Sequence, residues 1–298
     1  MAISLPQVVL QYRNTLDVTG NVARVAFLML LSPRKQLRLF QLFLSPTLLG
    51  IWLTRPRIVF KHLHKYLYLN CAPSICLTVL LYHYEFLLNR VHPQFFSKLV
   101  RFPPTLWTQE VFSKKVSISL TFPAPDDQEG DLALVIKVGS QRVFILSFSI
   151  VPSSCFDECE GTAIFVCRVQ GLTGSENIRD VCRLCDEVDP GAMLMAALTG
   201  FARSLDISRI YGVTTAAQLS CDNNNALGRR MVFDYDGFWG QMHAERYSQQ
   251  YFLLDCPIFR RPLSSIASKH RKRSLLKRNF KDAVAAHVVS NMRQHVLR

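Results

Sequence analysis

Residues 131–150 read DLALVIKVGSQRVFILSFSI and contain two strand-like halves. These halves alternate or run apolar and are rich in β-branched and aromatic residues, which is typical of strands. Between the halves lies GSQ, residues 139–141, a connection of hairpin length that begins with a glycine. The stretch therefore predicts two neighbouring antiparallel strands in the middle of the chain.

Strand signals continue on both sides of this hairpin. KVSISLTF at 115–122 precedes it, and TAIFVCRVQ at 162–170 follows it. Residues 189–207 then predict a helix with Pro190 at its start, where a missing amide hydrogen is tolerated. RIYGVTT at 209–215 predicts one further strand. This order predicts an α+β fold in which helices cover a mixed sheet.

The chain before residue 105 predicts helices instead. Apolar residues recur at spacings of three and four in RIVFKHLHKYLYL at 57–69 and ICLTVLLYHYEFLLNRV at 75–91. Residues 37–53, LRLFQLFLSPTLLGIWL, contain an arginine, a glutamine and a proline. They predict helices on a core or a membrane surface rather than a spanning helix. Prolines are expected to separate these helices, at Pro33, Pro46, Pro56, Pro73 and Pro93.

The C-terminal region predicts a long amphipathic helix. An apolar residue recurs at every fourth position, at Leu276, Phe280, Val284, Val288, Met292 and Val296. The front of this helix is densely basic, with a candidate patch of Lys269, Arg271, Lys272, Arg273, Lys277 and Arg278. We expect three parts: a helical region at 1–105, a sheet domain at 106–260 and this basic helix within 261–298.

Charge is unevenly distributed along the chain. Residues 1–70 hold nine basic residues and one acid, and residues 260–298 hold eleven and one. The region between them is mildly acidic, with fifteen basic residues and twenty acids. Two basic ends predict a polyanionic partner, either anionic lipid or nucleic acid. Little aromatic interleaving and no recognisable nucleic-acid module favour lipid, with nucleic acid as the alternative.

The start of the chain and the cysteines predict the compartment. MAISLPQVVLQYRNTLD, residues 1–17, has no basic n-region followed by an apolar core, so no secretory signal is expected. Nine cysteines is an odd number, and we expect free thiols. Zinc-like pairs, CxxxC and CxxC, occur at Cys155, Cys159, Cys182 and Cys185. However, residues 181–188 look helical and would pack the second pair, so no metal is expected.

One stretch could bind a phosphate. VCRVQGLTGSENIRD, residues 166–180, predicts a strand, a glycine-containing turn and a helix, which can present backbone amides to an anion. Acetyltransferases of the GNAT type hold the pyrophosphate of CoA with such a turn. A loose version of their pattern stands at Gln170, Gly171, Gly174 and Ser175. A lone loose glycine pattern is weak evidence, and an ordinary turn is the favoured interpretation. No cofactor is therefore expected, and CoA or acyl-CoA only if the chain is a transferase.

Two residues are candidate general bases. Glu129 lies just before the strand at 131–138 and could orient an amine or accept a proton, or simply edge a polar loop. His83 lies beside Tyr84 on an otherwise apolar helix. A hydrogen-bonded core pair is the expected explanation for these two residues, with catalysis as the alternative.

Aromatic residues gather in FDYDGFWGQMHAER, residues 233–246. Tyr235, Phe238 and Trp239 could wall a ligand pocket together with Asp236, or they could plug the sheet. We expect the plug. The chain contains no Ser/His/Asp order, P-loop, HExxH or Rossmann fingerprint.

Taken in order, these pieces resemble the VirK/YbjX family of Gram-negative bacteria, long classed as a domain of unknown function. The resemblance runs from about Leu53 to Ala283. Two departures occur: Asp131 stands where the family has a second Glu, and Asp189 stands before Pro190 where the family has Arg. The matching pieces are RPRIVFKHLHKYL, LYHYEFL, QEGDLALVI, RVFILSFSI, VQG, YDGFW and IASKHRKRSLLKRNF.

The resemblance implies a role in the cell envelope. The family is linked to virulence, to envelope integrity and to tolerance of cationic antimicrobial peptides, and VirK members to surface display of an actin-motility protein. We expect a cytoplasmic protein, peripheral to the inner membrane, with an anionic membrane surface and an envelope or virulence-factor client as partners. The alternatives are a GNAT-like acyl- or acetyltransferase acting on an envelope component, with Glu129 or His83 as base, and a nucleic-acid binder.

Overall fold

A computed structural model describes residues 32–124, 128–157, 160–172, 175–221 and 233–297. Its N-terminal part is helical, as predicted, and between residues 32 and 101 every helix begins at one of the five expected prolines. Proline suits a first helical turn because its missing N–H would have no intrahelical partner there. These helices are α3 (Pro33–Leu44), α4 (Pro46–Thr54), η1 (Pro56–Leu63), α5 (Pro73–Arg90) and α6 (Pro93–Arg101).

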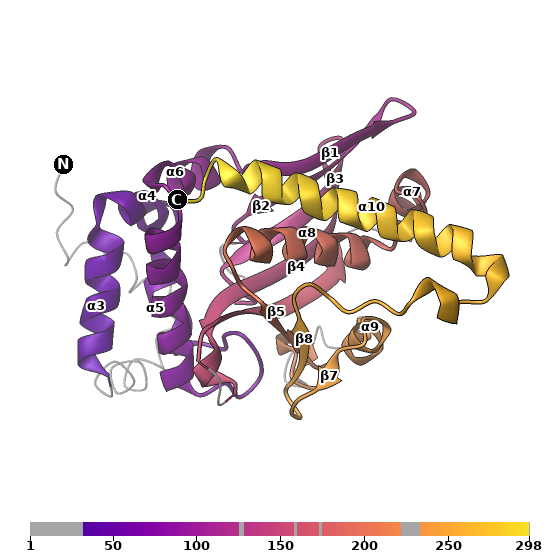
Figure 1. Cartoon of the computed structure of the whole chain (residues 1–298). Coiled ribbons are helices and arrows are strands. Elements are labelled where there is room, and N and C mark those ends of the chain that lie inside the picture. The colour runs from indigo at the N-terminus through magenta and orange to yellow at the C-terminus, as the bar shows by residue number, and fades with distance from the viewer. Residues whose placement is uncertain (1–31, 125–127, 158–159, 173–174, 222–232, 298) are drawn as a thin grey trace.

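An eight-stranded mixed sheet follows the helices (Figure 1). The strands lie in the order β1-β2-β3-β4-β5-β6-β8-β7, and only the β5–β6 pair is parallel within the described sheet. Helices before a mixed sheet confirm the predicted fold class. The strands are β1 (Thr105–Val111), β2 (Lys114–Thr121), β3 (Leu132–Val138), β4 (Gln141–Pro152), β5 (Thr162–Gly171), β6 (Arg209–Val213), β7 (Glu245–Arg246) and β8 (Tyr251–Asp255).

Helices α7 (Ser175–Leu184) and α8 (Pro190–Ser204) connect the two parallel strands. Asp189 caps α8, because its Oδ1 accepts hydrogen bonds from the amides of Gly191 (2.8 Å) and Ala192 (3.2 Å). The aspartate that departs from the family pattern therefore stabilises a helix start. Short elements complete this part: η2 (Ser153–Cys155), η3 (Leu219–Cys221), α9 (Tyr235–Gln241) and η4 (Leu263–Ser265).

The last helix, α10 (Ser268–Arg293), lies along α8 over one face of the sheet (Figure 1). The two helices cross closely at Gly200, where an added Cβ would lie 2.5 Å from the carbonyl oxygen of Ala285. The predicted apolar stripe of α10 is buried at Phe280, Val284, Val288 and Met292. Leu276 is 52% exposed, because the front of α10 extends past the sheet, and Val296 is half-buried beyond the end of the helix.

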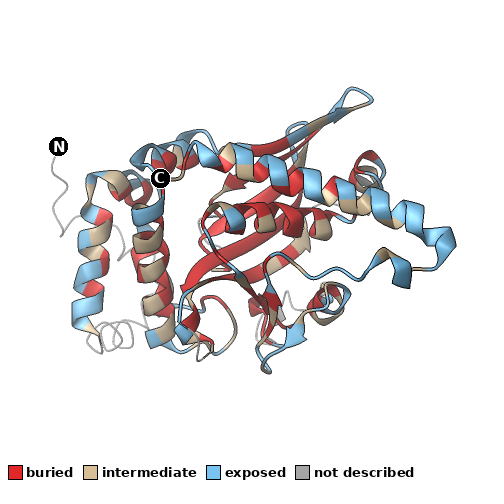
Figure 2. Ribbon diagram, viewed as in Figure 1, coloured by how far each residue is buried: buried red, intermediate tan, exposed pale blue. Residues whose placement is uncertain are grey.

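The C-terminal end of α10 meets the N-terminal helices. The amide of His92 donates to the carbonyl of His295 (2.8 Å), and the amide of Leu297 donates to the carbonyl of Arg90 (2.8 Å). Val91 and Val296 form an isolated antiparallel bridge between these bonds. One buried core extends from the N-terminal helices into the sheet and under α8 and α10, and Figure 2 shows the ribbon of its residues in red.

Residues 37–53 form parts of two helices rather than one. Helices α3 and α4 bend by 96° where they meet, and Leu39, Phe43 and Ile51 are buried in the core. In the part of the chain that the structure describes, no single helix meets the length and hydropathy needed to cross a bilayer, although this bent pair meets them jointly.

Candidate functional site

The parallel strands β5 and β6 separate halfway along β5. Their last paired residues are Val166 and Gly212, whereas β5 continues beside β4 to Gly171. A bulge occurs at the same point: Phe148 of β4 lies opposite Val166, and the preceding Ser147 lies opposite Arg168, so Cys167 is extra. A bulge increases the local twist of a strand. It therefore accounts for the divergence of β5 from β6.

Aromatic side chains from α9 fill this separation. The buried indole N–H of Trp239 donates to the carbonyl of Val213 (2.8 Å), at the end of β6. The hydroxyl of Tyr235 accepts from the amide of Val169 (3.2 Å), beyond the β5 bulge. Gly212 lies directly against the Trp239 ring, where a Cβ would collide with it. Backbone groups that lost their strand partner are thus bonded by two rings, the arrangement of a plug.

Two aspartates hold α9 in place. Asp234 caps the helix by accepting from the amide of Gly237 (2.9 Å). Asp236 accepts from the amide of Thr215 (2.8 Å), just after β6, and pairs with Arg246 of β7 (3.1 Å). Phe238 packs edge-on against Trp239, with ring centroids 4.9 Å apart. Asp236 therefore links α9 to the segment after β6 and to β7.

A tight turn before β3 directs two carboxylates to different partners. Gly130 has a φ of +92°, and an added Cβ would lie 2.6 Å from the amide nitrogen of Phe148. Only glycine fits such an approach without strain. The amide of Asp131 donates to the carbonyl of Phe148 (2.9 Å), which fixes the turn against β4. Glu129 and Asp131 consequently enter two separate networks.

Glu129 joins three segments of the fold. Its Oε2 lies 3.3 Å from Nε of Arg168 at the β5 bulge, and its Oε1 accepts a hydrogen bond from the side-chain amide of Gln218. Gln218 follows β6, and its own oxygen accepts from the amide of Ser220 (2.6 Å). Only 12% of the Glu129 side chain is exposed. A proton acceptor in this position would first have to break its ion pair.

Asp131 is the centre of a buried ionic network. The hydroxyls of Tyr66 and Ser149 (2.5 Å) donate to its Oδ2, and Lys61 lies 3.3 Å from its Oδ1. Burial by itself raises the pKa of Asp131. The charge of Lys61 and the two hydroxyl hydrogen bonds outweigh burial and hold that pKa below its usual value. The carboxylate is therefore ionised, and it ties η1 and the segment after it to the sheet.

His83 and Tyr84 are enclosed in the core. Nδ1 of His83 accepts from the amide of Ile150 (2.9 Å), and burial lowers the pKa of the ring to about 4. Nε2 of His83 and the hydroxyl of Tyr84 have no hydrogen-bond partner among the described residues. Both side chains are fully buried. The geometry matches a neutral core histidine more closely than a base that meets a substrate.

The predicted phosphate turn is described only in part. Gln170 and Gly171 form the end of β5, opposite Ile145 and Phe144 of β4. An added Cβ at Gly171 would lie 2.7 Å from Cδ1 of Ile178, so the glycine lets α7 pack against the strand. Gly174 lies outside the described residues, as does the side chain of Ser175 at the start of α7. Phosphate binding here stays a prediction.

The basic patch divides by residue type. Its arginines contact the protein: Arg271 donates to the carbonyl of Ile266 (2.8 Å), Arg278 donates to that of Arg261, and Arg273 pairs with Glu187 (2.5 Å). In contrast, the lysines of the patch have no ion-pair or hydrogen-bond partner within the described part of the chain. These lysines are Lys269, Lys272 and Lys277.

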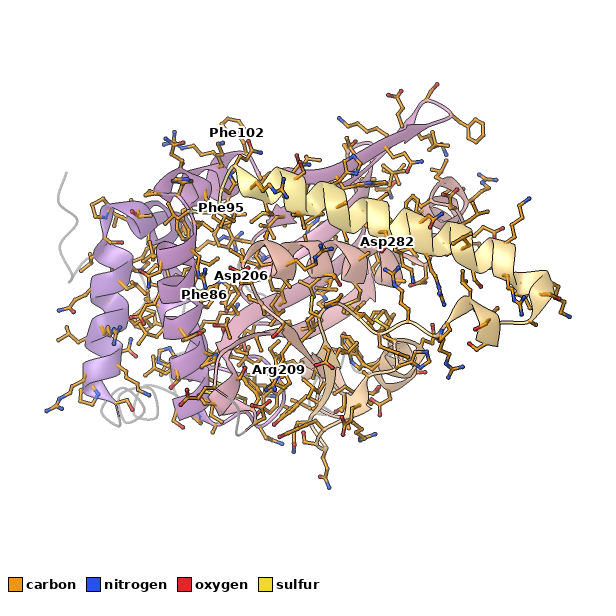
Figure 3. The ribbon with its side chains drawn as sticks, viewed as in Figure 1. Phe86, Phe95, Phe102, Asp206, Arg209 and Asp282 are labelled. Atoms are coloured by element: carbon orange, nitrogen blue, oxygen red, sulfur yellow. The ribbon has the colours of Figure 1, made fainter. Side chains whose placement is uncertain are left out.

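The arginine contacts organise the segment that precedes α10. Arg260 forms a two-pronged ion pair with Asp282 of α10 (2.6 and 2.8 Å), and Asp282 is labelled in Figure 3.

Two leucines of the patch region are largely exposed. Leu275 and Leu276 lie between the charged residues and are 44% and 52% exposed. A hollow of about 450 Å³ nearby has mixed charge, with Asp186, Glu187, Arg273 and Leu276 in its wall.

The described cysteines do not form a metal site. Among the described residues, no three His, Cys, Asp or Glu side chains are grouped to hold a metal ion. Cys159 of the proposed zinc pairs lies outside the described residues, whereas Cys185 is buried and has its pKa raised to about 12 by burial. Free thiols, as predicted, stand at Cys71, Cys76, Cys155, Cys167, Cys182, Cys185 and Cys256.

Sequence reasoning missed the partners of the two carboxylates. Arg168 had a readable signal, because a charged residue inside the apolar strand at 162–170 requires a counter-charge. Lys61 and Tyr66 belong to one of the quoted family pieces, yet they meet Asp131 from positions 70 and 65 residues away. Gln218 and Ser149 had no local signal.

Two comparisons with known proteins agree with the family resemblance. The model of the family DUF535, described as "Protein of unknown function (DUF535)", matches residues 16–288. The chain is also 23% identical over 257 residues to the uncharacterized protein YbjX of Escherichia coli (strain K12), covering 82% of this chain and 75% of that protein. The predicted VirK/YbjX resemblance is therefore confirmed.

Proposed function

This chain belongs to the DUF535 family of proteins of unknown function, and we propose that it binds the anionic surface of a membrane through the start of α10. One observation carries the proposal: the first turns of α10 extend beyond the sheet (Figure 1), and this part of the helix holds exposed leucines and lysines without a partner among the described residues. Each Lys or Arg near an anionic surface contributes about 1 kcal/mol. Lys269, Lys272 and Lys277 together would contribute about 3 kcal/mol, enough for peripheral attachment.

The basic residues of the N-terminal helices are expected to contribute less to lipid binding than those of α10. Helix α3 lies at the opposite end of the molecule from the start of α10 (Figure 1). Within α3, Lys35 donates to Thr78 (2.9 Å), and Arg38 pairs with Glu85 (2.5 Å). Cations that bond to the protein contribute less to lipid binding. We therefore assign the main lipid contact to α10.

Vesicle flotation tests this assignment. Replacing Lys269, Lys272 and Lys277 with glutamine should weaken binding to phosphatidylglycerol-containing vesicles on the order of a hundredfold, since about 3 kcal/mol is removed. The matched control replaces Lys98, Arg101 and Arg293, three exposed cations toward the other end of α10. It removes the same charge and should bind almost as wild type. Equal recovery of wild-type protein with neutral and anionic vesicles would contradict the proposal.

The cellular part of the proposal follows the family resemblance. We place the protein on the cytoplasmic side of the inner membrane, where it supports envelope integrity, display of a virulence factor and tolerance of cationic antimicrobial peptides. A strain lacking the gene should become more sensitive to such peptides. Wild type should restore tolerance, and the triple lysine variant should not. Full rescue by that variant would separate the envelope role from lipid binding.

A second candidate function is a GNAT-like acyl- or acetyltransferase. The parallel pair β5–β6, with its bulge and its separation, is the feature that favours this candidate. Against it, Tyr235 and Trp239 occupy the separation, and Gly171 contacts α7. A folded-state ligand raises the melting temperature by mass action. We expect no shift with millimolar CoA or acyl-CoA; a clear shift in the wild type that Gly174→Val abolishes would revive the enzyme hypothesis.

The same basic patch could bind nucleic acid instead of lipid, and a parallel titration with DNA distinguishes the two. A protein that neutralises several phosphates loses affinity steeply as salt rises. Duplex DNA titrated in parallel with vesicles should bind the wild type weakly. Tight, strongly salt-dependent DNA binding that the triple lysine variant abolishes would instead assign the patch to nucleic acid.

A further inference from the structure

The β1–β2 hairpin ends in an unusual turn. Its two central residues, Phe112 and Ser113, have φ values of +48° and +60°, between the paired ends Val111 and Lys114. Phe112 is 91% exposed. The hairpin extends from the body on the side where the start of α10 also extends (Figure 1).

Neither the backbone nor water favours phenylalanine at this position. A two-residue hairpin loop with two positive φ angles is usually built from Asn-Gly or Asp-Gly, because these residues tolerate the left-handed region. A bulky residue with positive φ is a true outlier. The ring also gains no burial from the fold. A position that breaks both rules without a visible gain in folding is expected to serve a contact outside the protein.

The charges around the tip identify the kind of partner. Lys114 and Lys115 follow the turn directly, and Lys114 pairs with Asp180 of α7 (3.1 Å). Lys115 lies opposite Glu110 across the hairpin. The adjacent β3–β4 turn adds the exposed Arg142, and it contacts the hairpin through the amide of Gly139. The tip is thus one aromatic ring at a mainly basic edge, not an apolar patch.

We propose that Phe112 inserts into the interfacial region of an anionic membrane, while the exposed Lys115 and Arg142 and the lysines of α10 contact the headgroups. The proposal rests on the proposed function and adds a second attachment point. A protein partner fits less well, because stable interfaces need a broad, well-packed area that a single ring cannot supply. A bilayer surface accepts one amphipathic or aromatic side chain with flanking cations.

A tryptophan at the tip reports insertion directly. The natural residues Trp52, Trp107 and Trp239 are buried, so Phe112→Trp adds the exposed indole. With anionic vesicles that carry brominated acyl chains, the added emission should shift to the blue and be quenched. Wild-type fluorescence is the baseline and should change little. Vesicle-bound protein whose tip tryptophan is neither shifted nor quenched would overturn the proposal.

Replacing Phe112 with asparagine separates insertion from folding. Asparagine tolerates the left-handed region, so Phe112→Asn should raise the melting temperature. It should also weaken vesicle binding about tenfold, since the apolar ring is lost. Phe112→Leu, which stays apolar, should retain most of the binding. Reduced stability in Phe112→Asn would instead show a folding role for the ring.

The α10 lysine variant makes the two proposals distinguishable. If wild type binds and Phe112→Asn binds equally well, while the triple lysine variant fails, the inference on Phe112 is wrong and the proposed function stands. If wild type does not bind anionic vesicles at all, the proposed function itself is wrong, and the inference falls with it.

Discussion

At the scale of single residues, burial decides what the titratable groups can do. His83 and His62 are enclosed in the core, and burial lowers the pKa of each ring to about 4. The Nδ1 of His83 must stay unprotonated to accept the amide of Ile150. Asp131 behaves oppositely to an isolated buried acid, because Lys61 and two hydroxyls hold it ionised. Each group thus supports folding in one charge state only.

The two histidines predict acid sensitivity. Unfolded histidine has a pKa of about 6.5, so between pH 6.5 and about 4 only the unfolded chain takes up the proton. Stability should therefore be complete above pH 6.5 and fall by about 1.4 kcal/mol per pH unit for each ring below it. Urea unfolding at pH 7, 6 and 5 measures this slope.

His83→Asn provides the test variant for this slope. An asparagine oxygen can accept from the Ile150 amide in place of Nδ1, so the variant should fold with a pH slope reduced by about one proton. The stability that the ionised Asp131 contributes is lost only at a more acidic pH, when the carboxylate is protonated, because its pKa is lowered from an already acidic value. An unchanged slope in His83→Asn would mean that His83 is protonated in the folded protein.

At the scale of elements, α9 is inserted into the sheet rather than packed on it. Its aromatic residues bond to the backbone of β5 and β6 where the two strands no longer pair. Gly212 and Trp239 are complementary, because the ring occupies the space that a side chain on the strand would need.

This fit predicts strong coupling between Gly212 and Trp239. Gly212→Ala should destabilise the protein by about 1–3 kcal/mol, as overpacking does. In a Trp239→Leu background the same change should cost much less, because the smaller side chain frees the space. A double-mutant cycle by urea unfolding measures the difference. Additive effects would mean that the ring and the strand do not press on each other.

How much of each element the sequence could predict depends on how local its cause is. The strands β2 to β5 carry their own apolar, β-branched patterns, and the N-terminal helices carry their own prolines. The strands β1 and β8 were not predicted: two prolines, Pro103 and Pro104, directly precede β1, and the five residues of β8 give little periodicity. The networks of Glu129 and Asp131 could not be predicted, since their partners depend on pairing across the whole sheet.

At the scale of the molecule, α10 connects regions that are otherwise far apart. Its C-terminal end joins α5 and α6, its middle packs on α8, and its start extends beyond the sheet (Figure 2). The stability of α10 against local opening should therefore be lowest at its start and higher toward its C-terminal end, because amides open most readily where few apolar contacts hold them.

Hydrogen exchange measures the gradient along α10. Amides of residues 269–276 should exchange much faster than those of residues 280–293, whose apolar side chains are buried. Anionic vesicles should slow exchange in the first group only. Uniform protection along the helix in the free protein would mean that its start is covered in solution.

The seam between residues 90–92 and 295–297 also constrains how the protein is made. Its two sides are separated by more than two hundred residues, so this contact has a high entropic cost of closure and is expected to form late. During translation, α5 and α6 emerge early but must wait for residue 297 before their last backbone partners exist. A nascent chain stalled before α10 would expose the apolar undersides of α6 and α8, and would therefore be a substrate for chaperones rather than a folded intermediate.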